Sequence, residues 1–208
     1  MRFTDHQHCA VLSKFCRGKL CEQLTQRPGR VLGRGEFIFL PSSPADSVYF
    51  LRDGLVKTST ISESGEELIL AIHQPGEIFG ELCLCGGERH AQALAMEPSE
   101  VVEIPFEALM AHLQGNRQAL TDFLSNLVRH LAEAYSQLET LAFDPTVQRL
   151  ARTLLKLAQE LGKPTPDGLE IDHYIRQEEL AQMIGARREV VSTALNRLRE
   201  MGLIDYSR

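Results

Sequence analysis

The stretch Arg176–Gly202, RQEELAQMIGARREVVSTALNRLREMG, predicts two helices joined by a tight turn. We expect the first helix over Gln177–Ile184 and the second over Arg187–Met201. Gly185 separates them, because a helix ends most easily on a residue that tolerates a positive φ. Ala181 is small and is expected to face inward, where two helices must approach closely. The pattern is that of a helix-turn-helix.

The second of these helices has a buried side and a charged beginning. Val191 and Leu195 supply the buried stripe at i, i+4. Arg187, Arg188 and Glu189 open the helix, and these residue types suit the reading of bases. Arginine can fork onto guanine, and glutamate can accept a hydrogen bond from cytosine. The stretch therefore favours DNA binding in a major groove over the alternative, an ordinary αα-hairpin with a solvated first turn.

The composition bounds the class of protein. The formal net charge is −6, but arginines crowd the last segment, so we expect a local positive face on an acidic body. No apolar run is long enough to span a membrane, and the N-terminus lacks the apolar core of a signal peptide. We therefore expect a cytoplasmic protein without a membrane partner. Its five cysteines are then thiols or ligands rather than disulfides.

Residues 30–104 have the sequence pattern of a β domain. Short runs rich in β-branched and aromatic residues alternate with turn signals at 52–54, 63–65 and 74–76. This spacing is expected of an all-β barrel or sandwich. A short helix is expected near Phe106–Leu113, so the β domain precedes the helical part of the chain.

A long helix is expected from about Asn116 to Phe143. Its apolar residues recur in alternating steps of four and three, which is the heptad pattern of a two-stranded coiled coil. We expect self-association into a homodimer through this seam, the alternative being a long helix packed on its own β domain. The expected seam consists of Leu120, Leu124, Leu127, Leu131, Ala134, Leu138 and Leu141.

The segment after the long helix is expected to begin with a hinge at Asp144-Pro145, because the residue before a proline disfavours the α region. An amphipathic helix is expected over Thr146–Leu161. A Gly/Pro-rich loop at 162–168 and an extended piece at 169–175 lead into the helix-turn-helix. The residues that follow it, Leu203–Tyr206, are expected to form the first strand of a wing.

Several segments occur along the chain in a specific order. They are YFLRDGLVK (49–57), GEELIL (65–70), QPGEIFGELCL (74–84), VVEIPFEAL (101–109), RLARTLLKLA (149–158) and the stretch quoted first. In this order they resemble the CRP/FNR family of bacterial transcription regulators. The resemblance implies an α+β fold with an N-terminal cyclic-nucleotide-binding-like β-roll, a long dimerisation helix and a C-terminal winged helix-turn-helix. The expected divisions are a cysteine-containing segment at 1–26, the roll at 27–114, the helix at 115–143 and the DNA-binding domain at 144–208.

The resemblance implies roles for residues at the DNA end. Arg188 and Glu189 stand where the family commonly contacts G·C pairs, and Ser192 stands where some members also read a base. Thr193 replaces the arginine that is usual at its position. A dimer would place two such helices about one DNA turn apart on palindromic DNA. With candidates for phosphate contact beside the first helix, the expected DNA-binding residues are Arg176, Gln177, Arg187, Arg188, Glu189, Ser192 and Thr193.

The resemblance also implies a nucleotide cassette in the roll. Glu81 and Arg89 match the residues with which cyclic-nucleotide-binding members hold the ribose and the cyclic phosphate, whereas His90 replaces the usual Ser or Thr. The polar contacts that cAMP-responsive members make from the long helix are expected to be missing. The corresponding positions are His130, Ala134 and Tyr135.

The cysteines offer a competing sensor. Cys9, Cys16 and Cys21 are similar to the N-terminal ligands of oxygen-sensing members of the family, and Cys83 or Cys85 would supply the fourth thiolate of a [4Fe–4S] cluster. Simple thiol redox sensing and free thiols without a sensing role are the alternatives.

The sequence contains no Walker-type loop, HExxH or GxSxG motif, so a catalytic interpretation has no residues to support it. We expect a homodimeric, sequence-specific DNA-binding transcription regulator, not an enzyme, with RNA polymerase among its partners. The favoured signal is oxygen or redox through the iron–sulfur cluster, and a cyclic nucleotide is the alternative. A ligand-binding β-roll that acts on a protein partner without DNA is the alternative from a different class.

Overall fold

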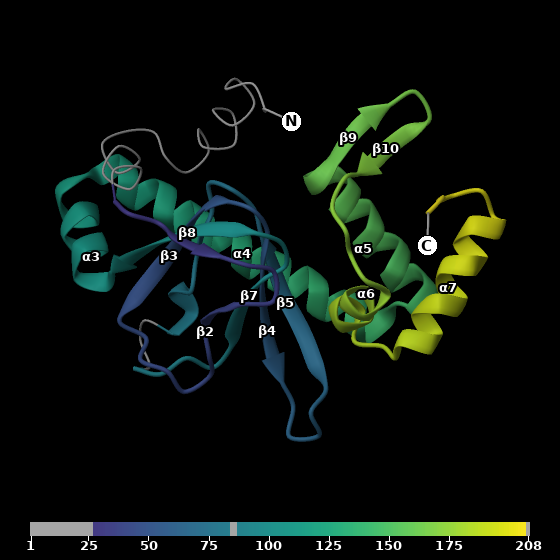
Figure 1. Ribbon diagram of the computed structural model, residues 1–208, viewed down its shortest axis with the longest axis horizontal. Coiled ribbons are helices and arrows are strands. Elements are labelled where there is room, and N and C mark those ends of the chain that lie inside the picture. The colour runs from purple at the N-terminus through teal and green to yellow at the C-terminus, as the bar shows by residue number, and fades with distance from the viewer. Residues whose placement is uncertain (1–26, 84–86, 207–208) are drawn as a thin grey trace. The chain divides into compact units, whose positions relative to one another are not determined.

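The computed structural model describes residues 27–83 and 87–206 (Figure 1). The described residues form two compact units, one of residues 27–65 and 70–132 and the other of residues 66–69 and 133–206. The first unit contains the β domain, apart from the start of β5, and the beginning of the long helix. The second contains the rest of that helix and the helix-turn-helix. The predicted cysteine segment 1–26 lies outside the described residues.

The β domain consists of two four-stranded sheets. The first sheet has the strand order β1-β8-β3-β6, with antiparallel neighbours, and the second has the order β2-β7-β4-β5. The strands are β1 (Arg30–Leu32), β2 (Phe37–Phe39), β3 (Ser47–Asp53), β4 (Val56–Ile61), β5 (Glu67–His73), β6 (Ile78–Phe79), β7 (Gln92–Ala95) and β8 (Ser99–Pro105).

Strand β3 shows why the sequences of the central strands are uninterrupted apolar runs. Its side chains alternate between two faces of the sheet. Tyr49 and Leu51 join a core that holds residues of both sheets, while Val48 and Phe50 join a second core shared with the helices. Both faces of this strand are therefore buried.

Two helices follow the roll, α3 (Phe106–Gly115) and α4 (Arg117–Phe143). Phe123 of α4 is buried in the second core, and Leu127 packs against it. The beginning of α4 is thus held on its own roll by apolar contacts. Neither α4 nor any other helix in the described ranges is long and apolar enough to cross a membrane.

The apolar residues that α4 leaves exposed agree only in part with the predicted seam. Leu127 faces the roll and Leu141 is half-buried, because the helix uses part of its apolar surface within its own chain. Leu120 and Ala134 are exposed as predicted. A continuous stripe in steps of four and three shares Leu124, Leu131 and Leu138 with the predicted seam and adds Val128 and Tyr135 in place of Leu127 and Ala134, and we call it the α4 stripe. Its members and their exposed fractions are Leu124 (51%), Val128 (66%), Leu131 (52%), Tyr135 (60%) and Leu138 (63%).

The second unit contains α5 (Thr146–Leu161), α6 (Gln177–Ile184) and α7 (Arg188–Glu200). The bounds of α5 and α6 are those predicted, and α7 is shorter than predicted by one residue at each end. The Gly/Pro-rich stretch predicted to be a loop is instead part of a hairpin, in which β9 (Gly162–Thr165) pairs with β10 (Gly168–Ile171). Proline is tolerated there because each strand of a two-stranded sheet has a free edge.

The prediction of a wing strand over Leu203–Tyr206 is wrong. Gly202 has a φ of +71°, and the N–H of Leu203 donates to the carbonyl of Leu198 at 3.1 Å. This left-handed turn sends the chain back towards α7. A strand requires a pairing neighbour, and within the described residues the tail has none.

Candidate nucleic-acid interface and effector cassette

The helix-turn-helix begins with a cap formed by Arg176 and Glu179. The backbone N–H of Arg176 donates to the Glu179 carboxylate at 2.6 Å, and an Nη atom of Arg176 lies 3.3 Å from the same carboxylate. Glu179 is only 2% exposed, so this pairing satisfies a buried charge. Arg176, a predicted phosphate contact, is therefore already engaged in holding the start of α6.

The turn between the two helices forms as predicted. Gly185 has φ 58° and ψ 51°, and the N–H groups of Gly185 and Ala186 both donate to the carbonyl of Ala181. The chain then enters α7, and its buried residues lie on one side at helical spacing. They are Val191, Ala194, Leu195 and Leu198. The opposite side of α7 is left to solvent.

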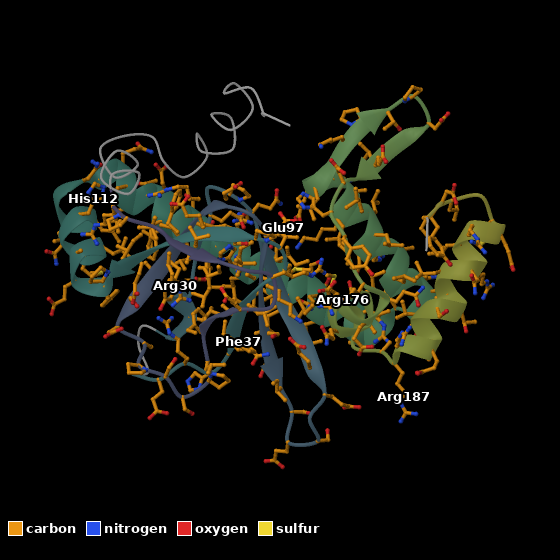
Figure 2. All side chains as sticks on the ribbon, in the orientation of Figure 1. Arg30, Phe37, Glu97, His112, Arg176 and Arg187 are labelled. Carbon is orange, nitrogen blue, oxygen red and sulfur yellow. The ribbon has the colours of Figure 1, made fainter. Side chains whose placement is uncertain are left out.

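Four side chains on α6 and α7 surround a hollow of about 310 Å³, and we call them the reading face. They are Gln177, Arg188, Glu189 and Ser192. Arg188 and Glu189 are exposed, and none of the four side chains makes a hydrogen bond or ion pair with another described residue. Arg187, beside them at the start of α7, extends away from the ribbon (Figure 2).

This arrangement has the chemistry of a DNA contact. The N-terminus of α7 carries partial positive charge, which attracts phosphate. The guanidinium of Arg188 and the carboxylate of Glu189, which have no partner among the described residues, are available for base edges. Thr193 differs from them, since its hydroxyl donates to the carbonyl of Glu189 at 3.0 Å and is used within the helix.

In the roll, Arg89 of the predicted cassette is turned inward. It is 2% exposed, and its guanidinium lies 4.4 Å and 5.4 Å from the ring centroids of Phe39 and Tyr49. Its Nη atoms donate to the carbonyls of Gly80 at 2.6 Å and Ser47 at 2.5 Å. Its Nε is buried without an acceptor among the described residues, so this N–H remains for an anion.

Glu81 lies in the short 3-10 helix η1 (Glu81–Cys83), and its carboxylate is 3.1 Å from Nδ1 of His130 on α4. Glu81 is therefore paired with a protein neighbour on the long helix. The expectation that α4 lacks the polar nucleotide contacts of cAMP-responsive members stays a prediction. Tyr135 is exposed, and so is His90, the predicted replacement for Ser or Thr.

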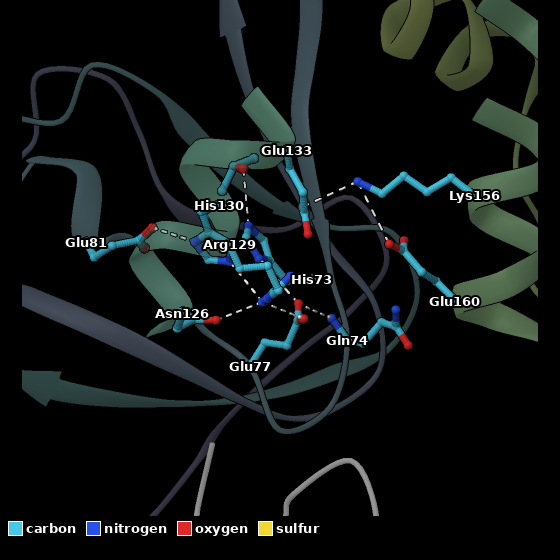
Figure 3. A network of polar contacts seen from close by, with 11 residues as sticks. His73, Gln74, Glu77, Glu81, Asn126, Arg129, His130, Glu133, Lys156 and Glu160 are labelled. Carbon is cyan, nitrogen blue, oxygen red and sulfur yellow. Dashed lines mark hydrogen bonds and ion pairs between the residues drawn. The ribbon is translucent and has the colours of Figure 1, made fainter. Parts of the chain in front are cut away.

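A network of polar contacts surrounds His130 (Figure 3). Glu77 accepts the N–H of Gln74 at 3.2 Å and lies 3.4 Å from an Nη atom of Arg129. Nδ1 of His73 is 3.7 Å from the same carboxyl group, and the Arg129 Nη is 3.1 Å from Nε2 of His130. These contacts tie α4 to the cassette and to the turn between β5 and β6.

Both carboxyl groups of the network have lowered pKa values. Burial alone would raise the pKa of Glu77, but the hydrogen bond and charge of His73, the N–H of Gln74 and the charge of Arg129 together outweigh it. Burial would likewise raise the pKa of Glu81, and the hydrogen bond from His130 is the largest of the effects that overcome it. Both groups are therefore carboxylate acceptors at neutral pH.

The predicted iron–sulfur ligands Cys9, Cys16, Cys21 and Cys85, together with the Cys83 side chain, lie outside the described residues. Within 27–83 and 87–206, no group of three or more His, Cys, Asp or Glu side chains is placed to hold a metal ion.

Two features of these sites were not predicted from the sequence. The cap of α6 could have been predicted, because Arg-x-x-Glu just before an apolar run has the spacing of a capping box. The polar network around His130 could not have been predicted, since His73, Glu77 and Arg129 are brought together only by folding.

Comparisons with known proteins match both ends of the chain. The cyclic nucleotide-binding domain family matches residues 29–116, and the Crp-like helix-turn-helix domain family matches residues 148–208. The global nitrogen regulator of Synechococcus elongatus is 35% identical over 90% of this chain and 83% of its own length. The CRP-like cAMP-activated global transcriptional regulator of Mycobacterium tuberculosis is 32% identical over 78% of this chain and 73% of its own.

Solved structures agree with these matches. A CRP-family transcriptional regulator from Thermus thermophilus has a TM-score of 0.72 and 29% identity, covering 86% of this chain and 88% of its own. The c-di-GMP responsive global regulator CLP of Xanthomonas campestris has the same fold, with a TM-score of 0.76 and 23% identity over 96% of each chain. The chain therefore belongs to the CRP/FNR family of DNA-binding transcription regulators, which act as dimers.

Proposed function

We propose that this protein regulates transcription by reading an inverted repeat in DNA as a homodimer. Arg188 and Glu189 contact base edges, and Ser192 extends the reading along the same face. Gln177 and Arg187 contact phosphates on either side and set the register. Thr193 faces the groove, and Arg176 adds a phosphate contact while it caps α6.

The observation that carries this proposal is the reading face. Its side chains converge on one hollow and have no hydrogen-bonding partner among the described residues. Polar groups left unpaired at the start of an exposed helix are available to an outside ligand. Arginine and glutamate side by side match a G·C pair, because one supplies donors to guanine and the other an acceptor to cytosine.

The division of labour along the chain is also proposed. Residues 27–114 receive the signal, residues 115–143 join the two protomers, and residues 144–208 bind DNA. RNA polymerase is the partner through which the bound regulator acts on transcription.

Selection of duplexes from a random pool tests the proposed function. We expect recovery of an inverted repeat whose half-sites have centres about 34–36 Å apart, because a two-fold dimer places its recognition helices one helical turn apart. A sequence without two-fold symmetry, or no enrichment at any ionic strength, would contradict the proposal.

For the signal, we propose a cyclic nucleotide bound in the roll. The family match over residues 29–116 and the cAMP-activated relatives support it. Glu81 and Arg89 are suitable groups for a ribose hydroxyl and a phosphate, and Nε of Arg89 has no acceptor among the described residues. Both are engaged by protein groups in this conformation, so the nucleotide has to displace His130 from Glu81 and re-aim the Arg89 guanidinium.

The second proposed signal is oxygen or redox chemistry at a [4Fe–4S] cluster. Its support is the set of five cysteines, since thiolates are the ligands that iron–sulfur clusters require. Four of Cys9, Cys16, Cys21, Cys83 and Cys85 would hold the cluster.

One preparation distinguishes the two signals. Protein purified without oxygen is examined for visible absorption, iron and sulfide, and its thermal unfolding is then followed with and without cAMP. The nucleotide proposal predicts that cAMP raises the Tm of the wild type and not that of Glu81→Gln. Iron-free, colourless protein would overturn the cluster proposal, and an unchanged Tm would overturn the nucleotide proposal.

A further inference from the structure

The tail that follows α7 folds back along the helix instead of leaving it. The N–H of Gly202 donates to the carbonyl of Arg199 at 2.9 Å, and that of Leu203 reaches back to Leu198 at 3.1 Å. This is the hydrogen-bond pattern of a helix end closed by a left-handed glycine. It brings Tyr206 beside the last two turns of α7.

Tyr206 makes two contacts with α7. Its hydroxyl donates to Oδ1 of Asn196 at 3.0 Å, and the guanidinium of Arg199 lies 5.1 Å from the centroid of its ring. Both Asn196 and Tyr206 are half-buried. The ring contact holds the tail, and the hydroxyl fixes which way the Asn196 amide faces.

Asn196 lies on the side of α7 that carries the reading face. It follows Ser192 by four residues and Glu189 by seven, so helical spacing places all three on one side. At about 1.5 Å per residue, Asn196 is about 10 Å along the axis from Glu189. The major groove is about 12 Å wide, so when the first turn of α7 meets base edges, Asn196 is near a sugar–phosphate strand.

The fixed orientation of the Asn196 amide determines which part of DNA it can bind. An asparagine that reads adenine uses its oxygen and its nitrogen together. Here Oδ1 already accepts the Tyr206 hydroxyl, and Nδ2 has no acceptor among the described residues. Two N–H donors without a neighbouring acceptor match the oxygens of a phosphate better than a base edge.

We propose that Tyr206 is a positioning residue which orients the Asn196 amide so that its N–H groups bind a backbone phosphate of duplex DNA. This inference rests on the proposed function and adds to it a contact outside the reading face. The contact strengthens binding without reading sequence.

The test compares wild type, Asn196→Ala, Tyr206→Phe and the double variant on the selected duplex and on its single-base variants. We expect Asn196→Ala to weaken binding about five- to tenfold on every duplex alike. The slope of affinity against salt should not change, because a neutral amide displaces no counterion. Tyr206→Phe keeps the ring under Arg199 and should show a smaller uniform loss. The double variant should bind no more weakly than Asn196→Ala.

Duplexes with one methylphosphonate per half-site identify the phosphate. One such position should weaken binding of the wild type and leave Asn196→Ala unaffected. Tyr174→Phe, which removes a hydroxyl from an exposed tyrosine elsewhere in the unit, is the control. Its affinity should equal that of the wild type.

Three results would overturn the inference. They are wild-type affinity for Tyr206→Phe, additive losses in the double variant, and a change of base preference in Asn196→Ala. A wild type that lacks any sequence preference would instead refute the proposed function, and the two failures are thus distinguishable. Thermal unfolding of each variant separates a loss of contact from a loss of fold.

Discussion

Replacing Arg188 with alanine is expected to reduce strongly the discrimination between the selected palindrome and other DNA, leaving the part that Glu189 and Ser192 supply. A bidentate arginine–guanine pair contributes roughly 1–3 kcal/mol of discrimination. A dimer makes the contact in both half-sites, so the affinity for the palindrome should fall by at least about 30-fold. Binding to unrelated duplexes should change little, because it depends on phosphate contacts. Fluorescence anisotropy with labelled cognate and scrambled duplexes measures both quantities.

Arg197→Ala is the matched control for this experiment. Arg197 is an exposed arginine of the same helix, nine residues from Arg188 and therefore on its opposite side. Its loss removes the same charge and should leave discrimination intact. Arg188→Lys keeps the charge but not the guanidinium fork, so it should retain binding to unrelated DNA and lose much of the preference for the palindrome. Equal preferences in Arg188→Ala and the wild type would show that Arg188 does not read a base.

The parts of the fold that were predicted correctly depend on local signals. α5 and α6 have the predicted bounds because a proline precedes one and a glycine follows the other. Gly185 adopts the left-handed conformation that its place between two apolar stripes required. The exposed Arg188 and Glu189 follow from the same pattern, since the buried stripe fixes which side of α7 is free.

The parts that were predicted wrongly depend on partners distant in the chain. The hairpin of β9 and β10 has a composition typical of a loop, and only pairing makes it a sheet. Leu203–Tyr206 is apolar enough for a strand but has no neighbour to pair with among the described residues. The pairing of His130 with Glu81 was not predicted, because only folding brings these two residues together. Contacts between residues far apart in the chain produce no periodic pattern in the sequence, so they cannot be predicted from it.

The most informative difference concerns which side of α4 is left exposed for a second copy of the chain. A heptad pattern identifies apolar positions but does not divide them between the helix's own roll and a second copy. Leu127 belongs to the core of the roll, and the α4 stripe lies beside it. Leu127→Ala should therefore lower the thermal stability of the protein and leave it dimeric.

Replacing Leu131 with glutamate is expected to dissociate the dimer. The α4 stripe exposes five large apolar side chains in one row, with Leu131 in the middle and 52% exposed. Monomeric proteins rarely leave such a row uncovered. Because the family acts as dimers, we expect the same stripe of a second copy to cover this row. Two facing carboxylates would be buried there without partners, which should raise the dimer dissociation constant by about 100-fold or more.

Sedimentation velocity over a range of concentrations measures the dissociation, and the same samples are tested on the palindrome. Ser125→Glu adds the same charge to an exposed position of α4 outside the stripe, so it should remain dimeric and bind DNA. Leu131→Glu monomers should lose affinity for the full palindrome, because one recognition helix then engages one half-site. A Leu131→Glu protein that stays dimeric would assign the interface to another surface. The spacing of the two reading faces would then need an origin other than α4.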